Sequence, residues 1–331
     1  MSGSIGPMSG PASLRAWWAQ CSPAAGAAVM ATVIVSVGLH LAGYEVLSRV
    51  FLVLACVTWV GLAADFVVRL VRERERWRAE AGTPEALTAV AATAVLGTRI
   101  SALGWQTLAE ALLALAAMLW PGLLFDVVRH WRARMPGSVF LSCVATQGLA
   151  VLGATLAGSE ATAWLAHAAL ALFWLGLVLY GFALARFDLR QVTEGAGDHW
   201  VAGGALAISA LAGSRLVAAD SARLYLWNDD DRGVLRAVTV VLLVLDGAWY
   251  AVLLVAEAVR PRLGYDAHRW ATAFPMGMTA AAVLSVAAAL DVPRIEGPGQ
   301  VLLWIAVAVW VAVAAGTVAA VRAGIRSTAP R

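Results

Sequence analysis

The sequence predicts an all-α membrane protein with ten transmembrane helices arranged as five helical hairpins. Hydrophobic residues make up 61% of the 331 residues and charged residues 14%, and the mean hydropathy is +0.77. That is more apolar surface than one soluble core buries. Apolar runs near the ~20 residues that a helix needs to cross the hydrocarbon core recur along most of the chain. The alternating pattern of a membrane β-barrel is absent, so the spans are predicted to be helices.

Charged or Gly/Pro-rich breaks divide the apolar sequence into ten predicted spans. Residues 1–22 are too polar for a signal-peptide core and are predicted to be a cytoplasmic tail. Residues 23–322 are predicted to form the transmembrane domain, and residues 323–331 a second cytoplasmic tail. The spans are predicted at 24–42, 46–71, 84–102, 106–129, 138–157, 161–186, 200–219, 233–259, 270–290 and 299–322.

The breaks alternate in charge, which predicts the orientation. Arginines follow the second, fourth, sixth, eighth and tenth spans, whereas the other breaks are short or acidic, as at 229–231. Basic loops remain on the cytoplasmic side of a membrane. Both termini are therefore predicted to be cytoplasmic, which requires an even number of spans and agrees with ten. The chain is predicted to be a multi-pass protein of the plasma (inner) membrane, with lipid as its main solvent.

Odd and even spans differ in composition, as expected for one hairpin repeated five times. Odd spans are short, rich in Ala, Gly, Ser and Thr, and several open with Pro or Gly, whereas even spans are longer and richer in Leu, Val and Trp. Small residues allow close helix packing. We therefore expect the odd helices to form an inner ring around a central pore and the even helices to face lipid. The alternative is that the odd spans are simply tightly packed core helices.

Four segments on odd spans resemble the tellurite-resistance and dicarboxylate transporter family, which includes plant slow anion channels, fungal malate permeases and sulfite exporters. The likeness covers nearly the whole membrane region and includes the five-hairpin plan. The segments are VMATVIVS at 29–36, VLGTR at 95–99, GDHW with GGALAI at 197–200 and 203–208, and WATAFPMGM at 270–278.

The resemblance implies a homotrimer in which each protomer has its own pore, occluded by a phenylalanine of the ninth helix. Phe274 holds that position in the matching motif, and Pro275 and Gly277 are the expected kink. An aromatic ring in a narrow channel expels water, so an ion cannot shed its hydration shell cheaply. The alternative is that a Phe beside a Pro is ordinary packing. The chain departs from the family at Val33, where a glycine is expected, and a β-branched residue there would stiffen or narrow the path.

Two arginines near the outer ends of odd spans, Arg99 and Arg215, are candidates for an electropositive pore mouth that concentrates anions. The alternative is that they snorkel to the headgroups or pair with acids such as Glu110 or Asp220.

Two further residues are candidates for proton-linked behaviour. Asp246 lies near the middle of the eighth span, where a carboxylate could couple anion movement to protons. It could instead bond a polar neighbour across a helix interface, which we favour because the eighth helix belongs to the outer ring. His199 lies at the cytoplasmic entrance of the seventh span and could sense internal pH. The plainer interpretation of its neighbour, Asp198, is a helix N-cap.

The predicted function is movement of small anions or dicarboxylates through a Phe-gated pore. A proton-coupled sulfite or organic-acid exporter is the alternative. An intramembrane enzyme is a weaker one, because the one acidic cluster, 228–231, is contiguous and has no second cluster to complete a metal site. No catalytic residue, cofactor, metal or nucleic-acid partner is expected, because the sequence lacks the corresponding motifs.

Overall fold

The computed structural model describes residues 22–73, 80–194, 197–220, 226–260 and 269–327, and all statements below concern these residues. They are almost entirely helical, and the one extended pairing among them is an isolated bridge between Met135 and Phe187. The all-α class is therefore confirmed. Most of the predicted tails, 1–21 and 328–331, lie outside the described residues, although the last helix continues to Ser327.

A long helix overlaps each of the ten predicted ranges. Short 3₁₀ segments η1 (Pro84–Leu87), η2 (Gly137–Phe140), η3 (Asp198–Trp200) and η5 (Pro293–Ile295) precede four of them, and α9 (Gln191–Glu194) is a single turn. The long helices are α2 (Ser22–Leu41), α3 (Glu45–Arg72), α5 (Thr88–Ser101), α6 (Gln106–Arg129), α7 (Leu141–Glu160), α8 (Ala163–Arg186), α10 (Val201–Ala219), α11 (Asp229–Val259), α12 (Trp270–Leu290) and α13 (Glu296–Ser327).

Eight helical segments of the described chain are long and apolar enough to cross a membrane, judged by length and composition. The other two long helices, α2 and α5, have shorter apolar segments. The apolar part of α2 is Ala25–Leu41, and α5 has 14 residues. Together with η1, which precedes it, α5 accounts for the predicted span at 84–102.

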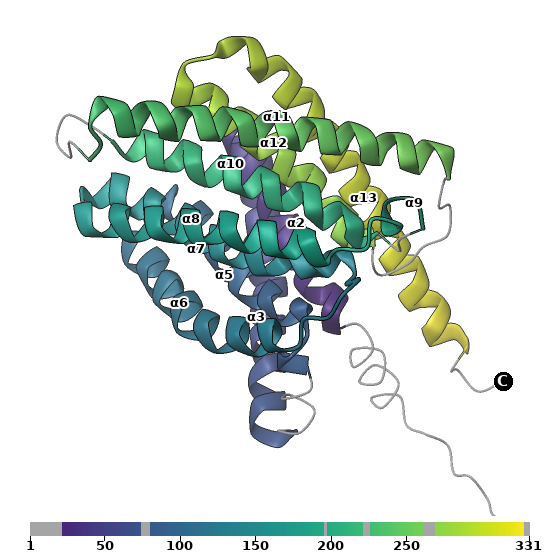
Figure 1. Ribbon diagram of the computed structural model, residues 1–331. Coiled ribbons are helices and arrows are strands. Elements are labelled where there is room, and N and C mark those ends of the chain that lie inside the picture. Colours follow the sequence, from purple (N-terminus) through teal and green to yellow (C-terminus); the bar gives the residue numbers. More distant parts are fainter. Residues whose placement is uncertain (1–21, 74–79, 195–196, 221–225, 261–268, 328–331) are drawn as a thin grey trace, which may run out of the picture.

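Successive helices pack as pairs, and the first helices of the pairs also pack on one another. The helix α2 contacts α3, α5 contacts α6, α7 contacts α8, α10 contacts α11, and α12 contacts α13. In addition, α2 contacts α5, α5 contacts α7, α7 contacts α10, α10 contacts α12, and α12 contacts α2, which closes a cycle. In Figure 1, α2 lies near the middle of the bundle, with α11 above it, α3 below it and α13 to its right.

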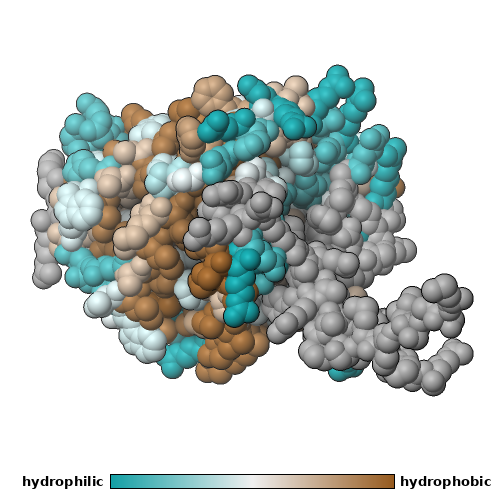
Figure 2. Space-filling view, turned by 90° about the horizontal axis from the view of Figure 1, so that it is seen from below, coloured by the Kyte–Doolittle hydropathy of each residue, from teal (hydrophilic) through white to brown (hydrophobic). Residues whose placement is uncertain are grey.

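Burial divides the helices into two classes. The apolar windows of α7, α10 and α12 are 94%, 89% and 83% buried, whereas those of α3, α6, α8, α11 and α13 are 17–28% buried. Large exposed hydrophobic side chains, among them Val57, Met118 and Val255, belong to the second class. Figure 2 shows the resulting hydrophobic surface across the middle of one face, with hydrophilic residues gathered at its left edge and upper right. The bulky helices therefore present their side chains outward.

Small residues in the buried helices permit these close contacts. A Cβ added at Gly97 of α5 would lie 2.6 Å from Leu152 of α7. One added at Gly213 of α10 would lie 2.2 Å from the Thr239 hydroxyl of α11. The Ala- and Gly-rich composition is thus a packing requirement at these positions.

One end of the cycle is formed by the 3₁₀ segments that precede the buried helices. The segment η1 contacts α2 and η2, η2 contacts η3, and η3 contacts α12. A Cβ at Gly137 of η2 would lie 2.3 Å from the backbone oxygen of Asp198 in η3, so these two segments touch through their backbones. The buried helices therefore begin at the same end of the molecule.

The acidic cluster 229–231 was expected in a break, and this prediction is wrong. These residues form the first turn of α11, where the Asn228 side chain caps the helix by accepting a 2.7 Å hydrogen bond from the Asp231 backbone N–H. Carboxylates are favoured there because the helix dipole is positive at its N-terminus.

Candidate pore and gate

Phe274 lies in the second turn of α12, buried at the contact with α10. Its side chain is 1% exposed. A Cβ added at Gly204 of α10 would lie 3.3 Å from Phe274 Cε1 and 3.1 Å from the Pro275 ring, so both rings are seated on a glycine. Any larger residue at Gly204 would push α12 away from α10. The ring thus lies where two helices of the cycle meet.

The helix α12 also approaches α2 closely, at Gly277. A Cβ at Gly277 would lie 2.9 Å from Ile34 Cγ2. The helix continues through Pro275, which has no N–H to donate to the preceding turn. Val33, the departure from the family pattern, is fully buried in α2 beside Ile34. The predicted kink residues are therefore contact points with both neighbouring helices of the cycle.

Two buried hydroxyls near the N-terminal end of the cycle have no hydrogen-bond partner in the described protein. They are Ser138 Oγ in η2 and Thr272 Oγ1 in α12, on residues that are 5% and 6% exposed. Buried hydroxyls are normally satisfied. Sequence reasoning missed them because Ser and Thr on the odd spans were interpreted only as small residues.

His199 lies at this same end of the molecule and is buried, with a relative exposure of 1%. It belongs to the 3₁₀ segment η3, which packs against η2 and α12. The N-cap prediction for Asp198 is wrong, because Trp200 holds the N-cap position of α10 without a side-chain bond and Asp198 lies inside η3. A short 3₁₀ turn therefore takes the place of a capped helix start.

Arg99 lies at the opposite end, in the last turn of α5, and is 1% exposed. Its Nη2 donates to Glu45 Oε1 at 2.8 Å, and its Nε donates to Ser48 Oγ at 3.0 Å. The predicted alternative partners, Glu110 and Asp220, are thus replaced by Glu45 of α3. The third nitrogen, Nη1, is buried without a partner in the described protein.

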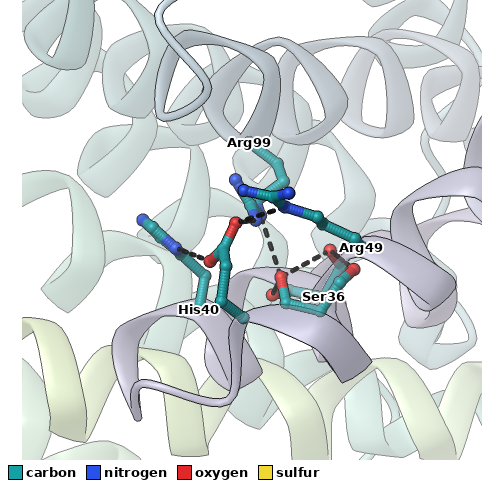
Figure 3. Close-up of polar contacts among 6 residues, drawn as sticks. Ser36, His40, Arg49 and Arg99 are labelled. Carbon is teal, nitrogen blue, oxygen red and sulfur yellow. Dashed lines mark hydrogen bonds and ion pairs between the residues drawn. The ribbon is translucent and has the colours of Figure 1, made fainter.

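A wider polar network holds Arg99 in place (Figure 3). Glu45 also accepts from His40 Nδ1 at 2.7 Å and from Arg49 Nε at 3.1 Å. Ser48 Oγ and Ser36 Oγ each donate at 2.7 Å to the other's backbone carbonyl, which ties α3 to α2. Figure 3 shows Arg99 and Arg49 approaching this cluster together with His40 and Ser36. One carboxylate therefore faces two arginines, and a net positive charge remains.

Arg215 lies near the same end, in the last turns of α10. Its side chain is half-buried, and its Nε has no hydrogen-bond partner in the described protein. Asp220, the acid proposed as its partner, pairs instead with Arg232 of α11. The structure therefore places both predicted arginines near the C-terminal ends of buried helices. Phe274, in contrast, lies near the N-terminal end of its helix.

Asp246 lies in the middle of α11 and is fully buried at the contact with α12. Its Oδ1 accepts a 3.1 Å hydrogen bond from Thr279 of α12. This is the polar neighbour across a helix interface that the favoured interpretation predicted. Its second oxygen, Oδ2, has no partner in the described protein. The residue is thus separate from both arginines and sits on the outward side of the helix that carries Phe274.

The described residues contain no group of three His, Cys, Asp or Glu side chains that could hold a metal ion.

Known proteins similar to this chain are membrane proteins. The chain is 32% identical over 118 residues to two uncharacterized membrane proteins of Mycobacterium tuberculosis, MT1776 of strain CDC 1551 / Oshkosh and Rv1735c of strain ATCC 25618 / H37Rv. Each match covers 34% of the chain and 58% of the relative, so the chain spans less than two thirds of these curated relatives. With eight membrane-length helices in its described residues, the protein is an integral multi-pass membrane protein.

A family model described as voltage-dependent anion channel matches residues 20–318. The match takes in all ten long helices except the end of α13. It confirms the resemblance that the four motifs predicted. The chain therefore belongs to the voltage-dependent anion channel family.

Proposed function

We propose that this protein conducts small anions through a pore enclosed by α2, α5, α7, α10 and α12, and that Phe274 closes this pore. Each protomer then has ten membrane spans in five hairpins, with α3, α6, α8, α11 and α13 facing lipid. The main support for the proposal is the contact of Phe274 with Gly204, between two helices of the closed cycle. Family membership supports anions as the substrate class.

The charges at the C-terminal end of the buried helices support an anion-attracting mouth. Arg99 and Arg215 come from two different helices of the cycle, and Arg99 Nη1 and Arg215 Nε have no hydrogen-bond partner among the described residues. Fixed positive charge at a narrow entrance raises the local anion concentration. At the other end, the hydroxyls of Ser138 and Thr272 have no partner within the described ranges, and they are donors that could replace part of an anion's hydration shell. Donors at both entrances favour anions over cations.

The proposal extends to the surroundings of the protomer. The protein lies in the plasma (inner) membrane with both termini cytoplasmic, an orientation supported by the arginine-rich alternate breaks. It assembles as a homotrimer with one pore per protomer, as the family resemblance implies. Native mass spectrometry in detergent tests the assembly, because a monomer or dimer as the main species contradicts it.

Anion flux in proteoliposomes tests the gate. In the Phe274→Ala variant the ring that fills the contact is removed, so anion efflux should rise at least about tenfold, the factor that ~1.4 kcal/mol produces. The matched control is Phe173→Ala on α8, which removes an equally buried ring from a helix outside the cycle. That variant should lose stability without gaining flux. Equal efflux from wild type and Phe274→Ala contradicts the gate, and equal gains in both variants indicate non-specific leakage.

A pH gradient separates the channel from the alternative, a proton-coupled exporter. A channel passes anions down their gradient whether or not a proton gradient is present. An exporter accumulates its substrate, sulfite or an organic acid, only when the proton gradient drives it. Uphill accumulation in wild-type vesicles would therefore replace the channel with the carrier.

A further inference from the structure

A hydrogen bond between an outward-facing helix and the next buried helix recurs at four places in the structure. At three of them an indole N–H donates to a threonine hydroxyl. Trp59 of α3 bonds Thr93 of α5 at 2.9 Å, and Trp120 of α6 bonds Thr146 of α7 at 2.9 Å. The third pair, Trp310 of α13 and Thr32 of α2, has a distance of 3.0 Å.

The three junctions share one chemistry. Each threonine hydroxyl also donates to the backbone carbonyl four residues earlier, to Ala89, Ser142 and Ala28 respectively, at 2.7–2.8 Å. Each hydroxyl therefore donates once and accepts once. Donor and acceptor are neutral, so such a junction is satisfied at any pH.

The fourth junction, between α11 and α12, carries Asp246 in place of the tryptophan. Here Thr279 donates to Asp246 Oδ1, which reverses the direction of the bond. Asp246 Oδ2 has no hydrogen-bond partner in the part of the chain that the structure describes, although its side chain is fully buried. Thr279 lies five residues after Phe274 on the same helix, and Gly203, next to the gate contact Gly204, would carry a Cβ 3.8 Å from Asp246 Oδ1. The exceptional junction is thus the one on the helix that carries Phe274.

The surroundings of Asp246 contain no cation to stabilise its charged form among the described residues, so the energy of this contact depends on whether Asp246 is protonated. Among the described residues, the phenols of Tyr180 on α8 and Tyr250 on α11 are titratable groups close enough to sense its charge. The facing positions of α10 and α12, Gly203 and Thr279, do not titrate, and within the described chain Asp246 forms no ion pair. A buried charge without a cation is far more costly than a neutral acid held by one hydrogen bond.

We infer that Asp246 is a proton-binding site that controls the Phe274 gate through its hydrogen bond to Thr279. The inference rests on the proposed function, because it assigns a regulator to the same gate. The neutral acid fits the closed arrangement, in which Phe274 is seated on Gly204. Loss of the proton creates a charge that must be solvated, which separates α11 from α12 and draws α12 away from α10.

Anion efflux from proteoliposomes, measured over a series of symmetric pH values, tests the inference. Wild-type efflux should rise about tenfold from acidic to alkaline pH, within the range typical of coupling between two sites. Asp246→Asn mimics the neutral acid and should stay at the acidic level throughout. Thr279→Val keeps Asp246 but removes the connection, so its pH dependence should be weaker than that of the wild type. Trp310→Phe breaks a neutral junction instead and should keep the wild-type profile.

Infrared difference spectra of the purified protein report the protonation state of Asp246 independently of any flux assay. The carbonyl stretch of a protonated carboxylic acid should disappear as the pH rises in the wild type and be missing in Asp246→Asn. A wild-type flux that ignores pH, an Asp246→Asn profile equal to the wild type, or identical spectra for the two proteins overturns the inference. Absence of anion flux at every pH from both the wild type and Phe274→Ala contradicts the proposed function instead, and the spectra then still report on Asp246.

Discussion

The contact between Phe274 and Gly204 predicts that a side chain larger than glycine at position 204 disturbs the gate. In the Gly204→Ala variant the added methyl group would lie 3.3 Å from Phe274 Cε1 and 3.1 Å from the Pro275 ring. Ordinary carbon–carbon contacts are 3.5–4.0 Å, about a few tenths of an ångström longer. Neither ring is a flexible chain end, so the helix carrying them must move. The variant therefore displaces Phe274 from its contact with residue 204 without changing Phe274 itself.

The size of the effect follows from this crowding. Overpacking a well-packed contact by one methyl group costs about 1–3 kcal/mol. The open state, in which Phe274 has left Gly204, does not carry this cost. The closed-to-open ratio should therefore fall by about 5- to 150-fold, since ~1.4 kcal/mol is a factor of ten. Anion efflux should rise by a similar factor as long as the closed state predominates in the wild type.

Gly153→Ala is the matched control for this prediction. Its methyl group would lie 3.3 Å from the Ala169 Cβ, so it crowds the contact of α7 with α8, somewhat less than Gly204→Ala crowds its own contact, and does so away from the gate. Both variants should show a lower melting temperature in detergent, and only Gly204→Ala should show raised anion efflux in proteoliposomes. Equal efflux from the two variants would refute the idea that Gly204 seats the gate.

Two further substitutions test the two ends of the buried helices. Gly137→Ala should lower the free energy of unfolding by about 3 kcal/mol or more, because its Cβ would lie 2.3 Å from the rigid Asp198 carbonyl. Thermal unfolding in detergent measures this loss. A melting temperature equal to that of the wild type would contradict the packing of η2 on η3. Glu45→Gln should lower the free energy of unfolding by about 1–3 kcal/mol. This is less than for a fully buried ion pair, because Arg99 is buried but the Glu45 side chain is 36% exposed. The control is Arg49→Gln at an exposed position, which should change the free energy of unfolding by less than about 0.5 kcal/mol.

Much of the fold could be predicted from the sequence, because membrane burial imposes length and composition on each span. The expected difference between slender and bulky spans corresponds to the observed difference in burial, with α12 83% buried and α13 17% buried. Gly204 and Gly277 show the physical reason, since a side chain at either position would collide with a neighbouring helix. The family motif identified Phe274, but only the structure places it against Gly204.

Partners distant in sequence could not be predicted. Arg99 was compared with nearby acids, yet it bonds Glu45, which is 54 residues away. A charged side chain of this length can reach several helices, and only the packing decides which acid it meets. The tryptophans of the even spans were interpreted as lipid-facing bulk. Their indole N–H groups instead bond threonines, as Trp59 bonds Thr93, and an amphipathic ring satisfies both roles at once.

Asp246 illustrates the limit of pattern reasoning. Its position in an even span favoured an interface role, and its hydrogen bond to Thr279 is such a contact. The sequence did not indicate that three other junctions use a tryptophan at this type of contact. Only the structure aligns the four junctions, and this alignment shows that a carboxylate at such a contact is exceptional.

The reversal potential of Phe274→Ala in a planar bilayer shows whether the path that Phe274 closes is selective for anions. Under a potassium chloride gradient, we expect a steady current that reverses near the chloride equilibrium potential. A variant that carries no current, or a current that reverses near the potassium potential, would contradict it.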